Sequence, residues 1–353
     1  MNSRTDKNLH TTKKSLLENT PGTGNILFPG LSNGVLFSST ASRTDRFRTP
    51  QPFSVPGISH LQKPARIQLQ QGSFFNDYLI VRRLSHTSLT FLVIPKNNTD
   101  LQNNPDTSVL QLFPKGENMD EFLLAAKKLS AMSSLQKPEE KITPQLLGYG
   151  VDDSGYGWLI TKYVEQPSLE YFIQAKAPLN EHKALFTIYK IAELLHKAFP
   201  QWGPHGKLAP SKILFAMKKP PLLLGMGVMR FFIKNKSTVF PDETFFYSSP
   251  EYIMKEELSQ QSDIYSLGII FYRLLSGVLP FYAENADALK EAHLQEILPP
   301  LSGKNLPVRI STLTQEILDK MTMKDPAERF STYRELLETL IKADDALPQE
   351  MKE

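Results

Sequence analysis

Residues 263–276 read DIYSLGIIFYRLLS, and this stretch decides the fold. If it is helical, apolar side chains occupy almost every side of the helix: Ile264, Leu267, Ile269, Ile270, Phe271, Leu274 and Leu275. A helix with so little polar surface is normally buried in the interior of a domain. The sequence therefore predicts a C-terminal region built around this segment as its central helix.

The regions on the two sides of Pro167 differ in their periodicity. Beyond it, apolar residues recur at helical spacing over residues 181–198, 313–321 and 332–342. Before it, one helix is predicted over 121–132, among short β-rich runs at 78–81, 91–94, 108–113, 146–150 and 157–160. A sheet-rich half followed by a helix-rich half predicts an α+β fold with two lobes.

Composition excludes several classes of protein. The 353 residues contain no cysteine, which rules out disulfides, thiolate metal sites and a cysteine nucleophile. A net charge of +3 argues against nucleic-acid binding through bulk charge. No apolar run reaches the roughly 18–20 residues of a membrane span, and the N-terminus lacks the apolar core of a signal peptide. A cytoplasmic protein without a membrane span is expected.

The first 70 residues differ from the rest. They carry nine basic residues against three acidic ones and are rich in Ser, Thr, Pro and Gly. They show no sustained periodicity, so they cannot bury enough surface to offset the entropy of ordering. We expect residues 1–70 to form a disordered basic tail. Their composition also resembles that of bacterial type III secretion signals, which leaves export as an alternative to a cytoplasmic location.

Four motifs in the second half carry a family resemblance. Ser249-Pro250-Glu251, residues 262–268, residues 275–281 and residues 325–330 are similar, in this order and spacing, to motifs of bacterial serine/threonine protein kinases. The resemblance implies a bilobal protein kinase-like fold over residues 74–344. Its implied parts are an N-lobe at 74–161, a hinge at 162–166 that includes Lys162, Tyr163 and Val164, a C-lobe at 167–344 and a C-terminal tail at 345–353.

The resemblance also assigns structural roles to four residues. Glu251 would form a buried ion pair with Arg329, and Asp263 would anchor the backbone of the catalytic loop. His205 begins the segment His205-Gly-Lys-Leu-Ala-Pro-Ser-Lys212, which resembles the family's catalytic loop His-Arg-Asp-Leu-Lys-Pro-Ser-Asn. We expect all four to be kept for the architecture.

The catalytic positions themselves are substituted. Lys207 stands where the family has the Asp that accepts the substrate proton, and Lys212 replaces the Asn that holds magnesium. Gly225 replaces the Asp of the Asp-Phe-Gly motif. A protonated lysine is no general base at neutral pH, and two lysines repel a metal cation. Only a lysine whose pKa is lowered by burial would still accept a proton.

The nucleotide-binding positions are substituted as well. The three glycines of the family's phosphate loop fall on Ser85, Thr87 and Thr90, whose β-carbons obstruct close approach by a phosphate. The strand Lys falls on Gln111 and the helix Glu that pairs with it on Ala125. Lysine and glutamate are lost together, which is coherent because neither is useful alone.

These substitutions predict a pseudokinase, a kinase-shaped module that binds other proteins, such as signalling proteins, as a scaffold or regulator. It would have no cofactor, no metal site and no nucleic-acid partner. Two alternatives stay open: an atypical active serine/threonine kinase that uses ATP with magnesium, and a sensor that binds a nucleotide or anion without metal. Of the remaining acidic residues, Asp344 and Asp345 are expected to form a solvated helix end.

Overall fold

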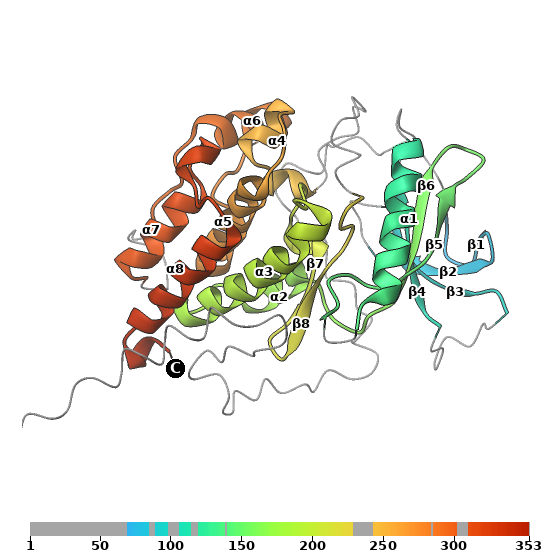
Figure 1. Ribbon diagram of the computed structural model, residues 1–353, viewed down its shortest axis with the longest axis horizontal. Coiled ribbons are helices and arrows are strands. Elements are labelled where there is room, and N and C mark those ends of the chain that lie inside the picture. Colours follow the sequence, from blue (N-terminus) through green and yellow to red (C-terminus); the bar gives the residue numbers. More distant parts are fainter. Residues whose placement is uncertain are drawn as a thin grey trace, which may run out of the picture.

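The structure is a computed structural model and describes residues 69–84, 89–97, 106–113, 119–137, 140–228, 243–283, 285–301 and 310–352. Figure 1 shows a sheet with one long helix on one side of the molecule and a larger group of helices on the other. The expected tail, residues 1–70, lies outside the described residues except for its last two.

The smaller lobe contains a six-stranded antiparallel sheet in the order β1-β2-β3-β4-β6-β5. Its strands are β1 (Phe74–Phe75), β2 (Tyr78–Arg83), β3 (Thr90–Pro95), β4 (Ser108–Phe113), β5 (Leu146–Val151) and β6 (Gly157–Lys162). Alternate residues of a strand face opposite sides of a sheet, so each strand contributes to two faces. The five β-rich runs predicted from the sequence are all strands.

Helix α1 (Met119–Leu135) covers one face of this sheet (Figure 1). The ring of Phe122 in α1 packs against the ring of Phe113 in β4, with the centroids 5.5 Å apart. The opposite face carries a separate apolar cluster of buried residues, which we call the outer cluster: Phe75, Ile80, Phe91, Val93, Leu110, Leu112 and Ile160. The buried residues of α1 instead belong to the main core, which continues into the helical lobe.

The larger lobe is helical apart from a small two-stranded sheet. Its elements are α2 (Leu169–Lys176), α3 (Glu181–Trp202), β7 (Ile213–Ala216), β8 (Lys219–Leu223), α4 (Pro250–Met254), α5 (Gln260–Ser276), α6 (Ala286–Gln295), α7 (Thr312–Met321) and α8 (Tyr333–Ala346). Together with the sheet-rich lobe this is the α+β, bilobal protein kinase-like fold that the sequence predicts.

The central helix predicted from residues 263–276 is α5. Every residue from Ser262 to Ser276 is buried. The helix begins with a capping box between Ser259 and Ser262, and it ends at Gly277, whose φ of 80° is in the left-handed region that favours glycine. Within it, a β-carbon on Gly268 would stand 2.7 Å from the Thr322 side chain, so only glycine allows this approach to the end of α7.

The C-terminal end of the lobe corrects one expectation. Asp344 is not solvated: it is 1% exposed, and one of its carboxylate oxygens lies 2.5 Å from Nδ1 of the buried His182 in α3. Helix α8 continues to Ala346, and Leu347 is a member of the main core. The packed lobe therefore extends past residue 344, because α8 lies along α3 and needs its last turn to bury Asp344 and Leu347.

Candidate functional site

Gln111 and Ala125, the residues predicted to replace the strand Lys and the helix Glu, lie on facing surfaces of β4 and α1. Gln111 is two residues before Phe113 and therefore shares its face of β4, the face that α1 covers. Thr90 of β3 is the cross-strand partner of Gln111. Ala125 lies in α1, three residues after Phe122, and is 9% exposed. The structure thus brings Thr90, Gln111 and Ala125 to one side of the sheet. Their side chains offer, in this order, a hydroxyl, an amide and a methyl group, but no charge.

Two other positions of the predicted nucleotide site, Ser85 and Thr87, lie outside the described residues. The predicted hinge begins at Lys162, the last residue of β6, and leads to α2. The Tyr163 amide donates to Thr107 O, which ties the hinge to the segment before β4, and the Gln166 amide donates to Val164 O within the hinge itself. These residues occupy the crossing between the two lobes.

The catalytic loop is anchored by the buried carboxylate of Asp263. The amides of His205 and Gly206 donate to its two oxygens over 2.6 and 2.8 Å. The hydroxyl of Tyr333, from α8, adds a third hydrogen bond of 2.9 Å. Sequence reasoning missed Tyr333, since a tyrosine at the start of an amphipathic helix gives no signal of such a role. Helices α5 and α8 together fix where the loop begins.

His205 connects the loop to the segment after β8. Its Nδ1 accepts a hydrogen bond from the Lys207 amide, so the neutral ring carries its proton on Nε2 and donates it to Leu224 O over 3.1 Å. The Leu224 amide in turn donates to Lys212 O over 2.8 Å. Two hydrogen bonds therefore hold the loop beside the residue that precedes Gly225.

The three substituted catalytic positions lie together around this connection. Lys212 is 6% exposed and Lys207 is half-buried. Gly225 has a φ of 80°, in the left-handed region that favours glycine. These three positions therefore carry two lysine side chains and a glycine.

Glu251 and Arg329 form a buried ion pair in the helical lobe. The two guanidinium nitrogens donate to the two carboxylate oxygens over 2.8 and 3.1 Å, and both side chains are almost fully buried. Arg329 also donates to three backbone carbonyls, those of Met323, Gln261 and Lys324. The arrangement joins α4 to the loop before α8 and to the start of α5.

A second buried arginine network was not found from the sequence. Arg273 of α5 makes two hydrogen bonds of 2.6 and 2.8 Å to Glu170 of α2, and its NH1 also donates to the Tyr247 hydroxyl. Burial raises the pKa of Tyr247, so it stays a neutral hydroxyl. No local pattern marks this network, because its three members come from segments far apart in the chain.

Two buried histidines predict how stability depends on pH. Burial lowers the pKa of His205 to about 4, with Lys212 and Lys207 acting in the same direction against the bond to Leu224. Burial, with the charge of Lys324, lowers the pKa of His293 to about 3. Below about pH 6.5 the unfolded chain therefore binds protons that the folded protein refuses. Each histidine should therefore lower the free energy of unfolding by about 1.4 kcal/mol for every pH unit between pH 6 and 4.

The check is urea denaturation from pH 7.5 to 4.5. His205→Asn and His293→Asn should each reduce the number of protons taken up on unfolding at acid pH by one, which makes the fall of the unfolding free energy with pH less steep. The double variant should reduce that number by two. Burial raises the pKa of Asp263 to about 6, so the folded protein binds a proton there more readily than the unfolded chain does. Protonation of Asp263 therefore raises the free energy of unfolding as the pH falls from 6 to 4, and it offsets the effect of one histidine in the parent protein. Parallel pH profiles for parent and variants would contradict this prediction.

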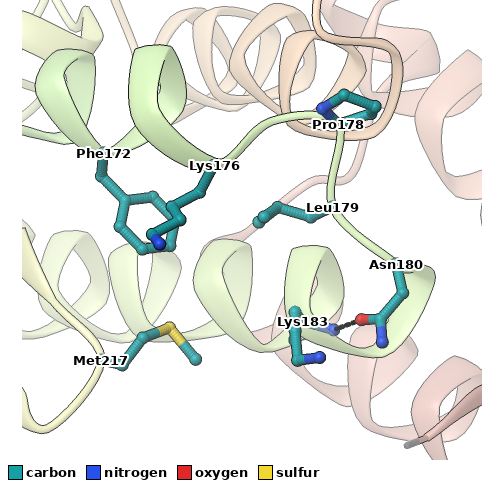
Figure 2. Close-up of a pocket in the computed structure, with 7 residues that line it drawn as sticks. All are labelled: Phe172, Lys176, Pro178, Leu179, Asn180, Lys183 and Met217. Atoms are coloured by element: carbon teal, nitrogen blue, oxygen red, sulfur yellow. Dashed lines mark hydrogen bonds between the residues drawn. The ribbon is translucent and has the colours of Figure 1, made fainter. Parts of the chain in front are cut away.

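A pocket of about 190 Å³ lies elsewhere on the helical lobe, between α2, the start of α3 and the turn after β7 (Figure 2). Phe172, Pro178, Leu179 and Met217 give it apolar walls, and Lys176 and Lys183 are its cations. Figure 2 shows Asn180 accepting a hydrogen bond from the Lys183 amide at the start of α3. None of the substituted catalytic or nucleotide positions lines this pocket.

Within the described ranges, no three His, Asp or Glu side chains gather in a way that would hold a metal ion. No helix in these ranges combines the length and the apolar character needed to cross a membrane.

Comparison with known proteins bears on the whole arrangement. The protein kinase domain family matches residues 129–341, more than half of the chain. The chain is 27% identical over 234 residues to the serine/threonine-protein kinase PrkC of Bacillus subtilis, covering 65% of this chain and 35% of the relative. It is 26% identical over 215 residues to the serine/threonine-protein kinase pkn3 of Myxococcus xanthus, covering 58% and 38%.

A plant protein gives a similar result. The calcium-dependent protein kinase 15 of Oryza sativa is 29% identical over 193 residues, covering 54% of this chain and 35% of the relative. The chain thus spans about a third of the length of these relatives. The two-lobed fold, the loop anchored by Asp263 and the family match lead to one conclusion: the chain belongs to the protein kinase domain family.

Proposed function

We propose that this domain is a pseudokinase, which binds other proteins as a scaffold or signalling regulator and transfers no phosphate. One observation carries the proposal: the loop scaffold is intact, but Lys207 presents a cation where the family has a carboxylate, Lys212 adds a second cation, and Gly225 presents no side chain. The anchor at Asp263 and the bonds of His205 hold the loop beside the Gly225 segment. What differs is the chemistry at the three positions.

Phosphate transfer needs the missing groups as a set. The transition state is stabilised by positioning and by neutralisation of the phosphate charge, which magnesium ions and their carboxylate ligands provide. Lys212 and Gly225 supply no anionic ligand, and Lys207 supplies a cation where a proton acceptor is required. A neighbouring group can compensate for one loss, but here the base, the metal ligands and the strand Lys at Gln111 are all replaced.

The test measures transfer and binding separately. With [γ-³²P]ATP and either magnesium or manganese, we expect no autophosphorylation and no labelling of a generic basic substrate, with an active bacterial kinase as the positive control. In thermal-shift titrations, we expect no stabilisation by millimolar ATP that depends on metal. Labelled phosphate that disappears in Lys207→Ala would overturn the proposal in favour of an atypical active kinase that uses Lys207.

One specific observation favours a second candidate, a metal-independent anion or nucleotide sensor. Lys207 and Lys212 both lie near enough to His205 for their charges to lower its pKa, and a lysine can bind phosphate directly. This candidate predicts stabilisation by ATP without magnesium that is lost in Lys207→Met and in Lys212→Met. A flat titration for the parent protein leaves the scaffold as the function that the site supports.

A partner search follows from the proposal. The bait is the full chain, and the matched bait lacks residues 1–70, which carry the excess of basic residues. Proteins captured by both baits bind the kinase-like domain, whereas those captured only by the full chain bind through the tail.

A further inference from the structure

The starting point is a lysine of α1 that reaches the helical lobe. Lys128 Nζ donates a hydrogen bond of 2.8 Å to the backbone oxygen of Gln201 and lies 5.5 Å from the centroid of the Trp202 ring. Gln201 and Trp202 are the last two residues of α3. Lys128 lies three positions after Ala125, so it follows by about one helical turn the position where active kinases hold α1 with a glutamate.

The end of α3 is suited to receive this cation. The last carbonyls of a helix have no partner inside the helix, and they carry the negative end of its dipole. Helix α3 has no basic residue in its last turn, where such a residue would normally satisfy these carbonyls. Lys128 supplies the missing cation from the other lobe, and the ring of Trp202 adds a cation–π contact.

Trp202 has a second neighbour, the turn that holds Gly225 and Gly227. Its indole is 3% exposed, and a β-carbon on Gly227 would stand 2.7 Å from its ring. Gly227 also has a φ of 77°, which any other residue would adopt only with strain. The indole therefore has the ammonium of Lys128 near its ring and packs tightly against the bare backbone of Gly227, where there is no room for a β-carbon.

We propose that Lys128, Trp202 and Gly227 form a clamp that fixes α1 to the helical lobe and couples its position to the Gly225–Gly227 turn. The clamp takes over the positioning of α1 that Gln111 and Ala125 no longer provide. It needs no nucleotide and no metal, and it differs from the proposed function because it concerns how the lobes are held rather than what they bind. A displacement of the turn moves the indole and releases α1.

Hydrogen exchange of the full chain tests the clamp. Lys128→Met keeps an apolar side chain but removes the hydrogen bond and the cation–π contact, so amides of residues 119–135 should exchange about 5- to 10-fold faster than in the parent protein. Lys127→Met is the matched control: Lys127 is the preceding residue of the same helix and is exposed like Lys128, and this variant should leave the exchange unchanged. Equal exchange in the two variants would overturn the proposal.

A second variant tests the coupling from the other side. Gly227→Ala pushes a methyl group into the indole and should also speed exchange in residues 119–135. Gly277→Ala is its control, because Gly277 has a φ of 80° but a β-carbon there meets its nearest neighbour only at 3.4 Å. Normal exchange in 119–135 with a folded Gly227→Ala protein would refute the coupling. If this variant does not fold, the comparison of Lys128→Met with Lys127→Met still decides whether the clamp exists.

Fluorescence gives an independent readout. The chain has two tryptophans, so in a Trp158→Phe background the emission reports Trp202 alone. Gly227→Ala should shift this emission to longer wavelength as the buried indole is displaced. An unchanged spectrum would show that Gly227 does not hold the indole, which contradicts the proposal.

Discussion

Replacing either Glu251 or Arg329 with alanine should lower the free energy of unfolding by about 3–5 kcal/mol, because the partner is left as an unpaired buried charge. Burial alone would raise the pKa of Glu251, but Arg329 holds it below its usual range. The Arg329→Ala change also removes hydrogen bonds to three carbonyls and the contact of the guanidinium with the Tyr265 ring, whose centroid is 4.9 Å away. Arg329→Ala should therefore be the more damaging of the two changes.

Urea denaturation of the single and double variants measures this effect. The two losses should be strongly non-additive, since the second mutation removes a charge that the first one left unpaired. Lys320→Ala is the control: its ion pair with Glu335 is about as short, at 2.8 Å, but both side chains are about 40% exposed. Such a surface pair contributes less than about 1 kcal/mol. Losses of that size at Glu251 and Arg329, summing additively, would show that the buried pair is dispensable.

The second large effect is expected at the anchor of the catalytic loop. Asp263→Ala removes the acceptor of the His205 and Gly206 amides and of the Tyr333 hydroxyl. A buried donor without a partner costs about 1–3 kcal/mol, so the variant should lose about 3 kcal/mol or more. The loop itself should also exchange its amide hydrogens faster, because among the described residues only Asp263 accepts the hydrogen bonds of those two amides.

Tyr333→Phe separates the anchor from general packing. It removes one donor and keeps the ring, which packs against Phe199 with centroids 5.8 Å apart. This variant should cost about 1 kcal/mol and leave the loop protected. If Tyr333→Phe were as damaging as Asp263→Ala, the packing of α8 rather than the carboxylate would hold the loop.

Much of the fold could be predicted from the sequence, because its signals are local. The apolar stretch 263–276 is the buried helix α5, and the β-rich runs are strands. Helix α1 extends past its predicted range at both ends, α5 at its start, and α3 and α8 at their C-terminal ends, because apolar periodicity does not mark where a helix begins or ends. Asp344 was misjudged because its burial depends on His182, 162 positions earlier in the chain.

The site shows the same division. The motif order predicts that Lys207, Lys212 and Gly225 occupy the catalytic positions, since the loop around them keeps recognisable neighbours. The roles of Lys128 and Arg273 could not be predicted, because a lysine on an amphipathic helix and an arginine in an apolar one gain a partner only after distant segments pack. Sequence order predicts which positions are substituted, whereas the contacts that hold the lobes together emerge from the packing.

The separation of the outer cluster from the main core has a consequence for how the chain loses its structure. Helix α1 packs in the main core with residues of α3 and α5, whereas the outer cluster draws its members from one face of the sheet. Cooperative units of unfolding follow such contacts rather than the conventional division into lobes. Strands β1, β2 and β3, which contribute residues to the outer cluster and none to the main core, are then expected to form a small subglobal unit that opens at lower free energy, while α1 unfolds together with the helices.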